Sequence, residues 1–248
     1  MTRLDAAPAT AWGAAARAAP QGWSMARTIL LICGILSSLL YVGTDILAAL
    51  RYEGYSYTAQ TVSELSAIGA PTRPLVIPIY VAYDVLLIAF GLGIRASARS
   101  KRTLRITAGL IVGIGVVGLA ALPFPMHVRG TGMTLTDTMH IVLTGAIVLL
   151  TLLAMGFGAT AYGRRFRLFS IVTLVTVVVF GVLAGLDGPR VAANLPTPWI
   201  GVTERINIGA YLLWVLVLGL TVLRARDSAA PDLLGSSSDT AMVARPAA

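Results

Sequence analysis

Three ionisable residues stand out because they fall inside strongly apolar stretches of the chain. Asp45 and Asp84 are carboxylic acids in two such stretches, and His140 lies in a third. An ionisable group within a membrane span is costly, so it usually faces the interior of a helix bundle and serves a function there. A histidine can act as a base or as a proton relay. We therefore predict binding or proton-relay roles for these three residues.

Further candidates lie close to one end of the apolar stretches. They are Glu64, Tyr80, Glu204, Arg205 and Asn207. Glu64 has a structural alternative, because the segment 61–64 reads Thr-Val-Ser-Glu and fits a capping box in which the glutamate bonds back to the helix start. Glu204 and Arg205 could bind a headgroup, or they could simply occupy the membrane interface at a helix N-terminus.

The elements that must position these residues are transmembrane helices. Of the 248 residues 56% are hydrophobic and only 12% are charged, and the mean hydropathy is +0.81, which excludes a soluble globular protein. A helix needs about 20 apolar residues to cross the hydrocarbon core. Six runs qualify, at roughly 28–50, 75–94, 104–122, 135–161, 168–186 and 203–223. We predict an all-α membrane protein with six helices in one bundle.

The basic residues predict the orientation of this bundle. Fourteen of the 19 Arg and Lys residues fall in the N-terminal segment, the second and fourth connections and the C-terminal segment, and five fall elsewhere. Cytoplasmic segments are enriched in Arg and Lys, so both termini are predicted to be cytoplasmic. This clustering between apolar runs indicates topology and not nucleic-acid binding. Residues 1–27 and 225–248 are predicted to be disordered cytoplasmic tails.

Helical spacing predicts where the polar groups gather. The first, second, fourth and sixth runs carry polar stripes in their outer halves, including Asp137, His140 and Thr144 in the fourth. The third and fifth runs instead carry glycines at small-xxx-small spacing, Gly109 with Gly113 and Gly181 with Gly185. We therefore expect an outward-facing polar cavity walled by runs one, two, four and six. His140 could alternatively bond Asp137 or Thr144, and His127 could be a solvated loop residue.

Several kinds of chemistry find no support in the sequence. There is no phosphate-binding loop, no nucleophile elbow and no His-Glu-x-x-His motif. Cys33 is the single cysteine, so an internal disulfide and a thiolate metal site are excluded. We expect no metal and no cofactor. The expected partner is the lipid bilayer, with a small-molecule or lipid ligand, and the oligomeric state stays open.

Short motifs spread along the chain resemble those of one membrane protein family. They are Ser63-Glu64-Leu65-Ser66, Gly69-Ala70-Pro71, Phe90-Gly91, Phe124-Pro125-Met126, His140, and Gly201 with Glu204-Arg205. Together they resemble the bacterial and archaeal family called domain of unknown function 998, over about residues 28–224. The resemblance implies a six-helix bacterial membrane protein. It carries no established activity and no catalytic residues.

Three functions remain open from the sequence. The first is a non-enzymatic protein of the cell membrane that binds or moves a small molecule, a lipid or a proton, with Glu204 and Arg205 at the entrance. The second is an outward-facing lipid hydrolase or transferase, with His140 as base and Asp45 or Asp84 as its orienting acid. The third is a structural or sensor subunit whose polar stripes only specify helix packing. We favour the first.

Overall fold

The computed structural model describes residues 21–227, and within them the chain is helical. The long helices are α2 (Gln21–Arg51), α3 (Arg73–Ser97), α4 (Arg102–Ala121), α5 (Leu135–Ala159), α6 (Arg164–Leu186) and α8 (Ile200–Asp227). Two short elements, the 3₁₀ helix η1 (Val62–Ser66) and α7 (Gly188–Ala192), lie in the connections. This part of the chain contains no β-strand, only one isolated bridge between Ile68 and His127.

The six predicted membrane spans are confirmed within the described residues. Six helices there are long and apolar enough to cross a membrane, and their limits differ from the predicted ones by a few residues. The largest difference is in α2, which already begins at Gln21, and α6 begins at Arg164 and so includes the basic cluster that precedes the apolar run. The predicted tails fall mainly on residues 1–20 and 228–248, which lie outside the described residues.

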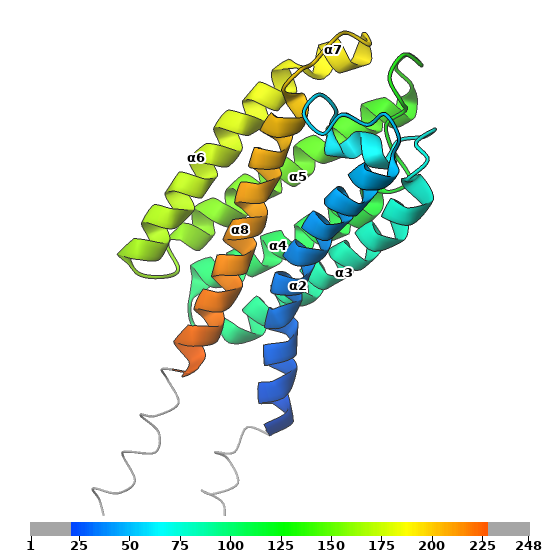
Figure 1. Cartoon of the computed structure of the whole chain (residues 1–248). Coiled ribbons are helices and arrows are strands. Elements are labelled where there is room, and N and C mark those ends of the chain that lie inside the picture. The colour runs from blue at the N-terminus through cyan, green and yellow to red at the C-terminus, as the bar shows by residue number, and fades with distance from the viewer. Residues whose placement is uncertain (1–20, 228–248) are drawn as a thin grey trace, which may run out of the picture.

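The six long helices form a closed ring. Each helix packs on the next one in the chain, from α2 through α3, α4, α5 and α6 to α8, and α8 packs back on α2 (Figure 1). The first helix begins and the last one ends at the same end of the bundle (Figure 1). Segments 52–72, 122–134 and 187–199 lie at the opposite end, which we call the loop end. The charge distribution predicts that the loop end faces away from the cytoplasm.

Buried polar side chains join the helices of this ring. Ser38 of α2 donates a hydrogen bond to the Leu212 carbonyl of α8 at 3.1 Å. The fully buried indole of Trp214 in α8 donates to Ser170 Oγ of α6 at 3.0 Å. Large apolar side chains face outward, for example Leu50 and Leu186 at 81% and 70% exposure. In a bilayer such exposure costs little, because lipid tails are as apolar as leucine.

The close helix contacts do not use all the glycines that their spacing suggested. A Cβ atom at Gly109 or Gly185 would meet nothing within 4 Å, so the expectation that these two residues pack tightly is wrong. The tight approach is made by Gly115 and Gly118 on another face of α4, against α3. A Cβ atom at Gly118 would collide with the Asp84 carboxylate. Glycine is required there because backbone and side chain approach too closely for any larger residue.

Helix α4 is shorter than its neighbours, and this shapes the loop end. It has 20 residues against 25 in α3 and in α5, or about 30 Å against about 38 Å of length. The chain beyond α4 runs alongside the turn after η1. Ile68 N donates to Met126 O at 2.8 Å, and Val128 N donates to Ile68 O at 3.2 Å. This pairing fixes the segment that carries His127 and Arg129 over the bundle.

Candidate functional site

An ion pair between α2 and α8 anchors the loop end. Arg205 donates from Nη2 to Asp45 Oδ1 at 2.8 Å and from Nε to Asp45 Oδ2 at 3.0 Å. The side chains are only 12% and 9% exposed. Tyr57 donates its hydroxyl to Asp45 Oδ2 at 2.6 Å. Asp45 is therefore fully engaged, and it is not available to orient His140 as the enzymatic hypothesis requires.

The same arginine also fastens the loop after α2. Its Nη1 donates to the carbonyls of Tyr57 and Gln60, and its Nη2 donates to the Tyr55 hydroxyl at 2.7 Å. Its guanidinium carbon lies 3.6 Å from the centre of the Tyr57 ring, within the range of a cation–π contact. A Cβ atom at Gly201 would collide with the Tyr57 and Gln60 carbonyls. Arg205 thus fastens α8 to α2 and to the loop after α2.

A second buried ion pair joins three loop segments. Arg129 donates from Nε to Glu64 Oε1 at 2.7 Å and from Nη2 to Glu64 Oε2 at 2.9 Å. Its other donors reach Thr197 Oγ1 at 2.8 Å and the Ala59 carbonyl at 2.9 Å. Segments 52–72, 122–134 and 187–199 therefore meet at this one guanidinium.

The predicted capping box at Glu64 is confirmed. Thr61 caps η1 by accepting from the Glu64 amide, and the Glu64 carboxylate accepts from the Thr61 amide at 2.7 Å. Burial acts to raise the pKa of Glu64, but the hydrogen bonds from Arg129, Thr61 and Gln60 outweigh it and hold that pKa below its usual value. The carboxylate is thus ionised and fully paired.

His127 and Asp137 form a third pair, which the sequence reading did not foresee. His127 Nδ1 lies 3.0 Å from Asp137 Oδ2, and the His127 amide donates to Oδ1 at 2.7 Å. Thr134 caps α5 and completes a capping box with Asp137. The expectation of a solvated His127 is therefore wrong. Asp137 bonds His127 and Thr134, and no hydrogen bond of the described residues joins His140 to Asp137 or Thr144, contrary to the structural alternative.

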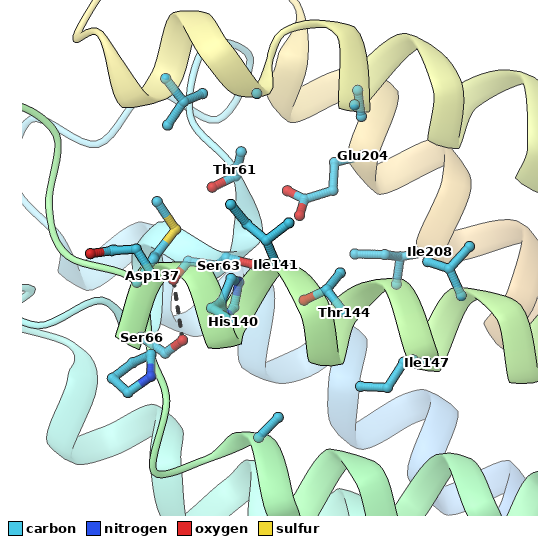
Figure 2. A pocket seen from close by; sticks show the side chains of 18 of the residues that line it. Thr61, Ser63, Ser66, Asp137, His140, Ile141, Thr144, Ile147, Glu204 and Ile208 are labelled. Atoms are coloured by element: carbon cyan, nitrogen blue, oxygen red, sulfur yellow. Dashed lines mark hydrogen bonds between the residues drawn. The ribbon is translucent and has the colours of Figure 1, made fainter. Parts of the chain in front are cut away.

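The ring of helices encloses a cavity of about 810 Å³ that extends from the loop end into the bundle (Figure 2). Its wall includes residues of all six long helices, so α4 and α6 contribute together with the four helices predicted. Most wall residues are apolar, such as Ile114, Ile147, Val177 and Ile208. The ionisable wall residues are Tyr41, Tyr80, Tyr83, Asp84, His127, Arg129, Asp137, His140, Glu204 and Tyr211.

Glu204 points into this cavity from α8 (Figure 2). Its Oε2 accepts from the Val62 amide at 2.5 Å, at the start of η1. No cation of the described chain forms an ion pair with it. Asn207, one turn further along α8, donates to the Val177 carbonyl of α6 at 2.5 Å and so also fastens two helices.

Asp84 lies deeper in the wall and has no hydrogen-bond partner among residues 21–227. It is 5% exposed, and Gly118 of α4 leaves room for its carboxylate. Close by, the buried Tyr211 hydroxyl of α8 likewise finds no partner in that part of the chain. The Tyr41 ring stacks on Tyr80 at 5.5 Å and meets Tyr83 edge-on at 5.1 Å. Two unsatisfied polar groups therefore stand beside an aromatic cluster.

The predicted residues thus divide into two groups. Asp45, Glu64 and Arg205 form buried pairs that fasten the loop end, whereas Tyr80, Asp84, His140, Glu204 and Asn207 line the cavity. The sequence reading missed Arg129 and the partnership of His127 with Asp137. A Thr-x-x-Asp pattern at 134–137 was the available signal for the last of these. Within the described residues, no three His, Cys, Asp or Glu side chains gather in a way that could hold a metal ion.

The fold defines the class of protein to which this chain belongs, a multi-pass membrane protein with six helices around a central cavity. Residues 35–221 match the family model described as "Protein of unknown function (DUF998)", so the chain belongs to that family. The resemblance found in the sequence motifs is confirmed. No curated protein and no solved structure gives a match.

Proposed function

We propose that this protein binds a small amphipathic molecule or lipid in the central cavity and moves it, or a proton, between the bilayer and the space at the loop end. One observation carries the proposal. A largely apolar cavity of about 810 Å³ holds two carboxylic acids, Asp84 and Glu204, that have no ion-pair partner in the described chain. Small-molecule sites are typically apolar clefts of about 300–1,000 Å³ with a few well-placed polar groups.

Binding accounts for these groups better than packing does. Buried polar groups are almost always hydrogen-bonded, and an exception calls for an explanation. At the loop end the ionisable groups obey this rule, because Asp45, Glu64 and Asp137 each have several donors. Asp84 and Tyr211 do not, and both line the cavity. A bound molecule that supplies the missing partners would explain why these groups are kept there.

Filling the cavity should remove the bound molecule. Thr144 of α5 points into the cavity (Figure 2), so Thr144→Trp should occupy much of the space beside Glu204. In native mass spectra of gently extracted protein, we expect an added mass on the wild type and its loss in this variant. Val142→Trp is the matched control, because Val142 lies two residues away on α5, is 57% exposed and does not line the cavity. Bare wild-type protein, or an equal added mass in all three samples, would contradict the proposal.

A second candidate is an outward-facing lipid hydrolase or transferase, and the observation that favours it is the His127–Asp137 pair. A carboxylate that holds Nδ1 of a histidine leaves Nε2 to act as a base, as in hydrolase triads. Ser63 and Ser66 line the same cavity as His127. This places the base at His127, and the orienting acid at Asp137, in place of His140 with Asp45 or Asp84.

The enzymatic candidate has its own test. His127→Ala should abolish the conversion of bilayer lipids, followed by mass spectrometry of liposomes that contain the purified protein, and it should leave the added mass in place. Thr138→Ala serves as control, because Thr138 follows Asp137 on α5, is exposed and does not line the cavity. If wild-type liposomes show no product, this candidate fails. If the added mass is absent as well, the remaining candidate is a structural or sensor subunit.

We also propose that the protein resides in the bacterial cell membrane.

A further inference from the structure

The environment of Asp84 calls for a positive charge or a proton. The carboxylate is 5% exposed, accepts no hydrogen bond from residues 21–227 and lies against the backbone of Gly118. An ionised carboxylate buried without a partner is very unfavourable. Its neighbours in the cavity wall, Ile114 and Tyr211, supply no cation. Asp84 is therefore either neutral or paired with a positive group that enters the cavity.

Tyrosine rings share the cavity wall with Asp84, and this favours a cation over a lone proton. Tyr83 precedes Asp84 in α3, and its ring meets Tyr41 of α2, which in turn stacks on Tyr80. Tyr211 of α8 adds an unpartnered hydroxyl to the same part of the wall. The faces of aromatic rings attract cations, and sites for quaternary ammonium groups are commonly built from several such rings. The cluster thus combines a carboxylate with aromatic faces and an apolar surround.

The other charges of the cavity do not change this balance. Arg129 is paired with Glu64, and His127 lies against Asp137, so neither residue presents an unpaired positive charge to the cavity. Glu204 has none in the described chain. The acids of the wall that lack an ion-pair partner in the described residues are therefore Asp84 and Glu204. Such a cavity admits cations and repels anions.

We propose that the ligand is a lipophilic cation, an alkyl or aryl ammonium compound or one of similar charge and shape. Its charge would lie against Asp84 and the tyrosine cluster, and its apolar body would lie along Ile147 and Val177 of α5 and α6. This proposal rests on the proposed binding function and adds the chemical class of the ligand. It also gives Gly118 a role, since only glycine leaves the Asp84 carboxylate its place in the cavity wall.

The test compares two probes of equal shape and opposite charge, tetraphenylphosphonium and tetraphenylborate, by calorimetric titration of the protein in a non-ionic detergent. We expect the cation to bind the wild type and the anion not to bind. Asp84→Asn should weaken binding of the cation at least tenfold. Gly118→Ala should do the same, because the added methyl group displaces the carboxylate. Asp187→Asn is the matched control, since Asp187 lies outside the cavity wall and only approaches Arg190 at 3.8 Å.

The outcomes separate this inference from the binding function on which it rests. Cation binding that is lost in Thr144→Trp but unchanged in both Asp84→Asn and Gly118→Ala would overturn the role of Asp84 and leave the cavity as the binding site. Tight binding of the anion would overturn the ligand class alone. The same holds if the cation does not bind, although the wild type carries an added mass that Thr144→Trp removes. Cation binding that is unchanged in all variants would show adsorption outside the cavity and overturn the inference. Gel filtration checks whether Asp84→Asn is folded. If it is not, binding of the cation to Gly118→Ala decides whether Asp84 holds the charge.

Discussion

Arg205→Ala should destabilise the folded protein by about 3–5 kcal/mol, the usual cost of removing one member of a buried ion pair. The Asp45 side chain is only 9% exposed in the wild type, and the variant leaves its carboxylate with Tyr57 as the remaining donor. The variant also releases the loop from Tyr55 to Gln60. Equilibrium unfolding in mixed micelles with increasing denaturing detergent would measure the loss.

A second arginine on the same side of the bundle provides the control. Arg190 is 51% exposed and lies 3.8 Å from Asp187, so Arg190→Ala should change the free energy of unfolding by less than about 1 kcal/mol. Adding Asp45→Asn to Arg205→Ala should recover part of the lost stability, because the orphaned charge is then neutral. Equal losses in the two arginine variants, or no recovery in the double variant, would mean that the α2–α8 pair does not hold the loop end together.

Arg129→Ala should be comparably destabilising and should also weaken one contribution to the pH dependence of stability. In the wild type the pKa of Glu64 lies below its usual value, so its contribution is complete above about pH 4.5 and is lost as the pH falls through the lowered pKa. Without Arg129 only the donors of Thr61 and Gln60 oppose the burial of Glu64, so that pKa rises from its lowered value. The stability that Glu64 contributes above about pH 4.5, and loses on acidification, becomes smaller.

The contribution of Glu64 can be isolated from that of the other carboxylates. Unfolding is measured between pH 4 and pH 7 for Arg129→Ala and for Arg129→Ala with Glu64→Gln, and the difference between the two curves reports Glu64. The same comparison between the wild type and Glu64→Gln gives the curve with Arg129 present. We expect the contribution of Glu64 to depend less steeply on pH when Arg129 is absent. Equal slopes would mean that Arg129 does not control the ionisation of Glu64.

The helices and the η1 cap could be predicted because their signals are local. Twenty or more apolar residues form a span whatever surrounds them, and Thr61 and Glu64 are only three residues apart. The same locality explains one failure. Asp137 has the spacing of a stripe with His140, yet α5 begins at Leu135, so Asp137 lies in the first turn and reaches back to His127.

The partnerships between helices could not be predicted, because periodicity gives the face of a helix and not its neighbour. Nothing in the sequence says that α8 closes the ring on α2, and so nothing pairs Asp45 with Arg205 across 160 residues. The sequence does not distinguish Gly109 from Gly118 as a helix contact, but only Gly118 faces α3. In the sequence, Arg129 is only one of the few basic residues predicted on the outer side. The distribution of Arg and Lys predicts the side of the membrane and not the partner of a side chain.

The closure of the ring by its first and last helices has a consequence for synthesis. At about 5–20 residues per second, the ribosome needs roughly 10–30 s to make the 160 residues that separate Asp45 from Arg205. The partner of the Val62 amide, Glu204, is also made 142 residues later. During this interval α2 must wait in or near the bilayer with an uncompensated acid. A chain that ends before Ile200 therefore leaves the ring of helices open and Asp45 without its guanidinium partner.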